Sequence, residues 1–340
     1  MGGNPVDVIK YKAPGGIEGL SIDEADDPGA PGPNEIRVRI HGSSLNGHDY
    51  NVARGIMPVA EGRVLMSDGA GEVEAVGSDV NEFAVGDHVV STFFPDWQRG
   101  DAPRASFART PGDGIDGYAA EVVLRPANFF TRMPRNWTFT EAATLPTAGL
   151  TAWRAIAILG KLQADQRVLV LGTGGVSIFA LQFAKSRGAR VIVTSSSDEK
   201  LEHAQAIGAD FGVNYRRHEN WSSKIMEWTD GRGVDLVVET GGPGTLPESM
   251  KATRIGGDIV LVGVLTGVQG QIPTAALMGR QQTLHGITVG STDHQKEMID
   301  ALDTMDLHPV TETCFALTEI RDAFRLQESQ QHFGKICLAY

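Results

Sequence analysis

The sequence predicts an α/β protein with two domains, a partly closed β-barrel and a doubly wound parallel sheet. Three observations support this expectation. Short strand patterns separated by Gly, Pro and Asp fill the first third of the chain, strand and helix patterns alternate from residue 167, and a glycine-rich turn opens that alternation. The length of 340 residues suits about two domains.

The strands of the first third are short and half-buried in pattern. Apolar residues alternate with arginines from Ile36 to Ile40, which is the period of a strand with one buried face. Residues 73–76 end at Gly77, and residues 89–90 follow a Gly-Asp turn. Such strands, punctuated by turn residues, indicate a barrel that closes on itself.

A long loop is expected at residues 93–117, where Gly and Pro are frequent and periodicity is weak. A strand follows at 118–124. Phe93, Phe94 and Trp97 in the loop either cover an apolar substrate or form a latch over the barrel, and the sequence leaves both open.

From residue 167 the sequence reads as successive βα units, which predicts a parallel, doubly wound sheet. A helix at 151–159 precedes it, and Gly188 and Gly208 end two of the later helices. The expected strands are 168–171, 191–193, 211–215, 234–238, 259–263 and 284–289, and the expected helices are 176–187, 198–207, 222–228, 246–253 and 293–305.

Composition excludes several classes of function. Asp and Glu total 42 against 30 Lys and Arg, a net charge of −12, which disfavours nucleic-acid and anionic-membrane partners. Cys314 and Cys337 can form neither a disulfide framework nor a four-thiolate zinc site, so we expect a cytoplasmic protein. No strongly apolar run is long enough to suggest a membrane span.

The glycine turn after strand 168–171 indicates a dinucleotide site. It follows an apolar strand and opens an amphipathic helix, the context in which Gly-x-Gly-x-x-Gly gains weight. The helix start offers unpaired N–H groups and a positive dipole end to a pyrophosphate, although Ser177 replaces the third glycine. The alternative is a structural βα turn without ligand. The residues expected to contact the cofactor here are Gly172, Thr173, Gly174, Gly175 and Val176.

The end of the second strand favours NADPH over NADH. An acid there would bind the ribose 2′-hydroxyl of NAD, but Ser195 and Ser196 stand in its place. These hydroxyls and Lys200 suit a 2′-phosphate, whereas helix capping is the structural alternative for the serines. Tyr215 either stacks near the adenosine or packs in the fold.

At this point the chain resembles the medium-chain dehydrogenase/reductase family over essentially its whole length, most closely the zinc-free, quinone-oxidoreductase-like branch. The motifs are Gly-Thr-Gly-Gly-Val-Ser at 172–177, Ser-Asp-Gly-Ala-Gly at 67–71, Val-Gly-Asp-His-Val at 85–89, Leu-Pro-Thr-Ala-Gly-Leu-Thr-Ala-Trp at 145–153 and His-Phe-Gly-Lys at 332–335.

The resemblance implies a GroES-like catalytic domain from residues 1–127 and 293–340, and a Rossmann NADP-binding domain from 128–292. It also implies a small-molecule substrate, a cofactor in the cleft, and a homodimer formed along strand 284–289. Backbone at Gly263, Val264 and Leu265 would face the nicotinamide, and Lys335 matches a position near the cofactor; a surface lysine is the alternative.

Zinc-bearing relatives bind their metal at three places that match Asn46, Ser67 with Asp68, and Thr147 in this chain. None of these residues is a thiolate or an imidazole, and a catalytic zinc needs three protein ligands. We therefore expect no zinc.

Without a metal Lewis acid, hydride transfer to an already electrophilic acceptor is favoured, such as a quinone or an α,β-unsaturated carbonyl. Asn46 could donate to the developing oxyanion, and Thr151 matches a position beside the nicotinamide. Asp49 and His48 could position water or relay a proton, or Asp49 could cap a helix. The competing functions are an NADPH-binding sensor or structural protein without turnover, and an alcohol dehydrogenase.

Overall fold

The computed structural model describes residues 4–102, 107–311 and 313–340. The chain forms two compact units: Met1–Leu150 with Gly290–Tyr340, here the barrel unit, and Thr151–Val289, here the sheet unit. The sequence had placed these boundaries at residues 127/128 and 292/293. Residues 128–150 instead pack with the barrel unit.

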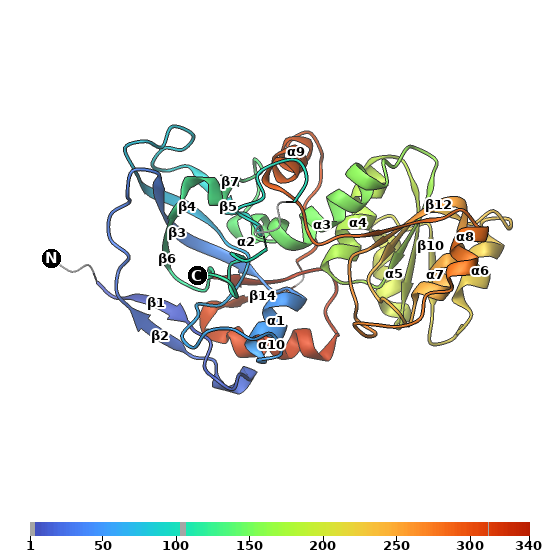
Figure 1. Ribbon diagram of the computed structural model, residues 1–340, viewed down its shortest axis with the longest axis horizontal. Coiled ribbons are helices and arrows are strands. Elements are labelled where there is room, and N and C mark those ends of the chain that lie inside the picture. Colours follow the sequence, from blue (N-terminus) through green and yellow to red (C-terminus); the bar gives the residue numbers. More distant parts are fainter. Residues whose placement is uncertain (1–3, 103–106, 312) are drawn as a thin grey trace. The chain divides into compact units, whose positions relative to one another are not determined.

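The barrel unit contains the predicted short strands (Figure 1). Its main sheet runs in the order β14 (Thr313–Ala316), β15 (Ile336–Ala339), β3 (Glu35–Ser44), β4 (Ala70–Val76), β5 (His88–Ser91), β7 (Phe130–Arg132), and β6 (Val122–Pro126) also pairs with β3. The strands β1 (Val6–Ile9) and β2 (Ile22–Ala25) form a separate antiparallel two-stranded sheet.

Strand β3 shows why the sequence folds this way. Its alternating residues Ile36, Val38 and Ile40 are fully buried, while Arg37 and Arg39 both pair with Glu74 on β4. Gly71 lets β4 approach β3 closely, because a Cβ on it would lie 1.9 Å from the Arg39 carbonyl oxygen.

The barrel unit also contains several short helices. Gln295 fastens α9, because its amide donates to the Ser91 carbonyl and to Thr131 Oγ1 at 2.9 and 2.8 Å. The helical segments are η1 (Ile17–Gly19), α1 (Gly47–Ala53), η2 (Ala127–Phe129), α2 (Phe139–Ala142), η3 (Leu145–Gly149), α9 (Thr292–Leu302), η5 (Leu317–Glu319) and α10 (Ile320–Ser329).

The aromatic residues of the expected loop form a latch within the barrel unit. Phe93, Phe94 and Trp97 are buried, and Phe107 and His294 pack against them edge to face. Of the two roles left open for these aromatics, the packing role matches the structure. Residues 103–106 of this loop lie outside the described residues.

The sheet unit is the doubly wound parallel sheet, with its strands in the order β10 (Phe211–Asn214), β9 (Arg190–Ser195), β8 (Arg167–Leu171), β11 (Val234–Glu239), β12 (Thr253–Leu261), β13 (Thr283–Gly286). Every neighbouring pair in this order is parallel. The strands β8 and β11 are almost entirely buried, which explains their continuous apolar runs. The predicted α/β fold class, a barrel unit together with a doubly wound parallel sheet, is confirmed.

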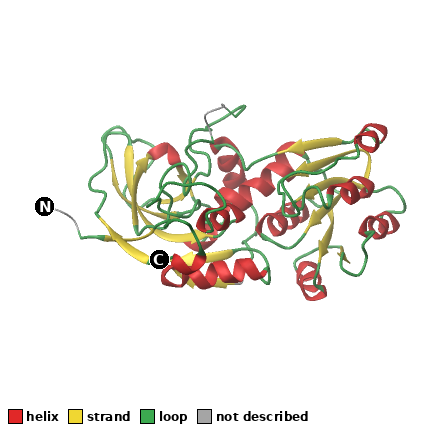
Figure 2. Cartoon of the chain, turned by 60° about the horizontal axis from the view of Figure 1, so that its bottom comes forward, coloured by secondary structure: helices red, strands yellow, loops and turns green. Residues whose placement is uncertain are grey.

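Helices surround the parallel strands (Figure 2). They are α3 (Leu150–Trp153), which begins at the last residue of the barrel unit, η4 (Arg154–Leu159), α4 (Gly175–Ser186), α5 (Asp198–Ala206), α6 (Trp221–Trp228), α7 (Leu246–Ala252) and α8 (Thr274–Gly279).

One helical stretch differs from the expectation that no apolar run is long enough to span a membrane. Residues Phe139–Leu159 form a helix long and apolar enough to cross a membrane by length and composition. Its most apolar window is 72% buried inside the protein, as in the core helix of a folded domain.

Candidate functional site

The glycine turn lies at the carboxyl edge of the sheet unit, where β8 passes into α4. Gly172 adopts φ +76°, a left-handed conformation that favours glycine, and its N–H donates to the Thr194 carbonyl. Gly174 has an ordinary φ of −78°, and a Cβ built on it meets no atom within 4 Å. The fold therefore does not require a glycine at 174, and the open space at this helix start fits the pyrophosphate of a dinucleotide.

Ser177 explains the departure from the third glycine. The side chain is buried, and its Oγ donates to the Leu171 carbonyl at 2.7 Å. This hydrogen bond ties the first turn of α4 to the end of β8. Thr173 is buried in the same turn, while Gly175 and Val176 are partly exposed.

The end of β9 presents serines in two different roles. Ser195 is buried and its Oγ accepts from the Ser197 N–H, whereas Ser196 is partly exposed. Ser197 caps α5 by accepting from the N–H of Lys200. Ser196 is therefore better placed than Ser195 to meet a ligand directly.

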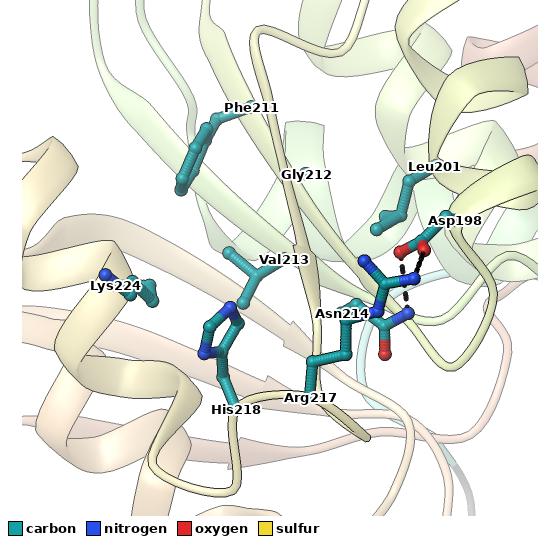
Figure 3. A pocket seen from close by; sticks show the side chains of 9 residues that line it. All are labelled: Asp198, Leu201, Phe211, Gly212, Val213, Asn214, Arg217, His218 and Lys224. Carbon is teal, nitrogen blue, oxygen red and sulfur yellow. Dashed lines mark hydrogen bonds and ion pairs between the residues drawn. The ribbon is translucent and has the colours of Figure 1, made fainter.

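At the start of α5, Asp198 interacts with two partners (Figure 3). Asn214 Nδ2 donates to its carboxylate at 2.7 Å, and the Arg217 guanidinium pairs with its other oxygen. A hollow of about 280 Å³ lies here, along β10 between α5 and α6. Arg217 thus brings a positive charge to the first turn of α5, which also contains Lys200.

The sequence reasoning missed Arg217. The signal was the Arg-Arg pair at 216–217, directly after the third strand and the exposed Tyr215.

The end of β11 holds a buried carboxylate that the sequence reasoning also missed. Glu239 accepts from the N–H groups of Gly241 and Gly242 at 2.7 and 3.0 Å, from Thr245 Oγ1 at 2.6 Å, and from Ser249 Oγ. These four donors satisfy both oxygens and hold the turn at the carboxyl end of the strand.

The turn after β11 also supports the loop after β12. Thr266 Oγ1 donates to the Gly241 carbonyl and accepts from the Gly244 N–H, both at 2.8 Å. Val264 and Leu265 expose their side chains, with Gly263 before them partly exposed. The loop expected at the nicotinamide is therefore exposed to solvent, and Thr266 fixes it to the turn after β11. Thr151 is buried at the start of the sheet unit.

The barrel unit contains a buried polar cluster, here the Asn46 cluster, made of Asn46, Asp49, Asp68, Thr147 and Lys335. Asp49 lies in the first turn of α1 and accepts from two backbone groups, the N–H of Asn46 at 2.9 Å and that of Ser67 at 2.7 Å. Its carboxylate thus holds the fold at α1 rather than facing a ligand, which departs from the expected catalytic role.

The amide of Asn46 is fully used inside the cluster. Its Nδ2 donates to Asp68 Oδ2 at 2.8 Å and to Asp49 Oδ2 at 3.0 Å, and its Oδ1 accepts from Lys335 Nζ at 2.6 Å. The expected donation from Asn46 to a substrate oxygen therefore has no N–H to make it. The reason is that two carboxylates and one ammonium surround a single amide.

Lys335 is buried rather than exposed. Its Nζ donates to the Leu45 carbonyl and to Asn46, so the ammonium points into the cluster. Burial lowers the pKa of this lysine, and the charges of Asp68 and Asp49 raise it. The expected contact with the cofactor thus gives way to a role inside the barrel unit.

Asp68 is fully buried and accepts from Thr147 Oγ1 at 2.6 Å, from Asn46, and from Ser44 Oγ at 3.2 Å. Burial raises the pKa of Asp68 to about 6; Lys335 opposes this shift and the charge of Asp49 adds to it. Thr147 is the partly exposed member of the cluster.

These residues do not fit a zinc ion. The positions matched to a zinc site offer one carboxylate, one amide and two hydroxyls, and a lysine ammonium lies 2.6 Å from the amide oxygen. In the described part of the chain, no group of three or more His, Cys, Asp or Glu could hold a metal ion.

A GroES-like barrel unit with a glycine-turn Rossmann unit defines a nicotinamide-dependent oxidoreductase, and the chain belongs to the medium-chain dehydrogenase/reductase superfamily. The alcohol dehydrogenase GroES-like domain model matches residues 32–135, and the zinc-binding dehydrogenase model matches residues 175–306.

Individual relatives agree with this assignment. A zinc-type alcohol dehydrogenase-like protein of Schizosaccharomyces pombe is 37% identical, over 95% of this chain and 96% of its own. The crystal structure of an NAD-dependent alcohol dehydrogenase is 33% identical with a TM-score of 0.89, covering 98% of this chain and 99% of that one. A quinone oxidoreductase of Pseudomonas syringae is 27% identical with a TM-score of 0.83, covering 98% and 100%.

Proposed function

We propose that this chain is an NADPH-dependent, zinc-independent oxidoreductase that delivers a hydride to a quinone or an α,β-unsaturated carbonyl. The observation that supports it most is the Asn46 cluster, where the positions matched to a zinc site offer only one carboxylate besides an amide and hydroxyls, and a lysine ammonium contacts the amide oxygen. A metal Lewis acid would polarise a simple ketone or acidify an alcohol, whereas a conjugated acceptor is already electrophilic without one.

The sheet unit would hold the cofactor along its carboxyl edge. Gly172 and Gly174 leave the helix start of α4 open to the pyrophosphate, and Ser196, Lys200 and Arg217 supply hydroxyl and cationic partners for a 2′-phosphate. When bound, the nicotinamide supplies the hydride. The chain's own contribution is to orient the ring with the braced loop at Gly263–Leu265 and to provide hydrogen-bond donors for the substrate oxygen.

Steady-state oxidation of NADPH tests the proposal. The purified protein should reduce members of a panel of quinones and enones, and should leave saturated ketones and aldehydes of similar size unchanged. Elemental analysis of the same sample should find no stoichiometric zinc, and a chelator should not alter the rate. Tight NADPH binding without turnover on any acceptor would favour a sensor or structural role instead.

Alcohol dehydrogenase is the second candidate, because two of the relatives above carry that name. It predicts stoichiometric zinc and NAD-dependent oxidation of a simple alcohol. The same elemental analysis, combined with an alcohol and NAD assay, separates the two candidates.

We also propose that the protein forms a homodimer through the β13 side of the sheet unit. β13 is the last strand in the sheet order, so one of its edges has no strand partner in the described part of the chain. None of the residues of α8 is buried. Ile255 on β12, Val268 in the loop that follows it and Met278 on α8 are all exposed. An uncovered edge beside exposed apolar side chains is typical of an association surface.

A further inference from the structure

The Asn46 cluster contains one more negative charge than positive charge. Asp49 and Asp68 face a single ammonium, that of Lys335, and all three side chains are buried. An uncompensated buried charge is costly, so the cluster favours taking up one proton.

The hydrogen bonds show where that proton belongs. Both oxygens of Asp49 accept from backbone N–H groups, which cannot reverse their direction. Among the described residues, the Asp68 carboxylate accepts from no backbone group; two of its three partners there are the hydroxyls of Thr147 and Ser44, and a hydroxyl can accept as well as donate. A proton on Asp68 Oδ1 therefore needs only a rotation of the Thr147 hydroxyl.

That rotation changes what Thr147 offers outward. With Asp68 ionised, the Thr147 hydrogen points to Oδ1 across 2.6 Å. With Asp68 protonated, the carboxyl donates to Thr147 Oγ1, and the Thr147 hydrogen turns away from the cluster. Thr147 is the partly exposed member of the cluster, so its hydroxyl is the group through which a proton can leave the cluster.

We propose that Thr147 is the residue that donates the proton to the substrate oxygen, and that Asp68 behind it is the proton reservoir. This inference rests on the proposed reductase function. It also gives the oxyanion the donor that Asn46 cannot supply. Thr147 precedes Thr151 by four residues on one helical stretch, from the motif at 145–153.

The step balances as follows. As the substrate carbon accepts the hydride, its oxygen takes the proton of Thr147 Oγ1. The O–H bond of Thr147 breaks while a new one forms with the proton of Asp68 Oδ1. The substrate gains one hydride and one proton, Thr147 is unchanged, and Asp68 is left as a carboxylate that solvent reprotonates before the next turnover.

Four titratable side chains surround the charge of Asp68. Lys335 and Asp49 face it within the cluster, and Tyr118 and Cys337 lie near enough to interact with its charge. Burial raises the pKa of both Tyr118 and Cys337, that of the thiol to about 12, so neither changes its charge in the range where Asp68 does.

Infrared titration of the cofactor-free protein tests the reservoir directly. A carboxylic acid band should vanish as the pH rises through about 6, and Asp68→Asn should lack it. Thr147→Val should keep the band to higher pH, because it removes a donor that stabilises the carboxylate. Thr147→Ser should titrate like the wild type. So should Thr144→Val, a matched control whose lost hydroxyl bonds only the Glu141 carbonyl on the same helical stretch.

Turnover tests the donor. Thr147→Val should lower kcat by about 10²–10⁴-fold, the range for loss of a general acid, with NADPH affinity unchanged. Thr147→Ser should restore most of the rate, and the fall of kcat at high pH should be absent from Thr147→Val. A Thr147→Val enzyme that matches Thr144→Val in rate and pH profile overturns the donor role, and an unchanged band in Asp68→Asn overturns the reservoir. A wild type that reduces no acceptor overturns the proposed function itself.

Discussion

Asn46 is a residue whose neighbours decide its role. From sequence, an amide at a matched zinc position is a natural donor to substrate, yet here Asp49, Asp68 and Lys335 use all of it. Asp49 is only 3 residues away, but Asp68 and Lys335 are 22 and 289 residues away, so no local pattern could reveal the full set of partners. Thr147 was matched only as a missing ligand, and its bond to Asp68 became visible only in the folded chain.

The buried carboxyl of Asp68 makes a prediction about stability. Its pKa is raised from 3.8 to about 6 on folding, so the folded state holds a proton between these values that the unfolded state has released. The free energy of unfolding should therefore fall as the pH rises from about 4 to about 6, by an amount on the order of 3 kcal/mol, and level off above.

Asp68→Asn should remove that fall. The variant mimics the neutral carboxyl, so its stability should exceed that of the wild type most clearly above pH 6. Urea unfolding at a series of pH values measures this. Equal pH dependence in both proteins would show that Asp68 titrates normally.

Ser196 makes a prediction about the cofactor. Ser196→Asp places a carboxylate where we propose a 2′-phosphate, so NADPH affinity should fall at least about tenfold relative to NADH. Ser223→Asp, an exposed change on α6 that adds the same charge, is the control. Fluorescence titration with both cofactors measures the ratio, and an unchanged preference would place the phosphate elsewhere.

At the scale of elements, the glycine turn and the start of α4 separate what the fold needs from what a ligand needs. Gly172 is required by its backbone, whereas Gly174 borders open space. The sequence predicted the turn and its helix, because both depend on local pattern. It did not predict how Ser177 or Glu239 hold the turns, since Ser177 bonds to Leu171 on β8 and Glu239 also bonds to Ser249 on α7.

Gly174→Ala tests this distinction. The change should leave the free energy of unfolding within about 1 kcal/mol, because its Cβ meets nothing and its φ is ordinary. It should weaken NADPH binding about tenfold or more, because the methyl group enters the space we assign to the pyrophosphate. Gly19→Ala, also in open space but in the barrel unit, should change neither quantity much. Unaltered NADPH affinity in Gly174→Ala would argue against this position of the cofactor.

At the scale of the whole molecule, the fold class and family followed from the sequence and are confirmed. The succession of βα units and the motifs along the chain were sufficient for this. The division of the chain was less accessible, because no pattern in residues 128–150 shows which core they join.

The proposed dimer makes the prediction at this scale. Ile255→Asp combined with Met278→Asp should convert a dimer into a monomer, because the two side chains are 65% and 76% exposed beside the β13 edge. Ile56→Asp, at a position 60% exposed in the barrel unit, is the matched control and should remain dimeric. Sedimentation velocity measures the oligomeric state of the wild type and of each variant. A monomeric wild type, or a double variant that stays dimeric, would contradict the proposed surface.

The place of β15 has a consequence for biosynthesis. This strand, four residues from Ile336 to Ala339, lies between β14 and β3 and so joins the last residues of the chain to the first hundred. The sheet unit is one uninterrupted segment and can fold on the ribosome once residue 289 has emerged, but the barrel unit must wait until β15 has emerged as well. Until then one edge of β3 stays without its strand neighbour β15.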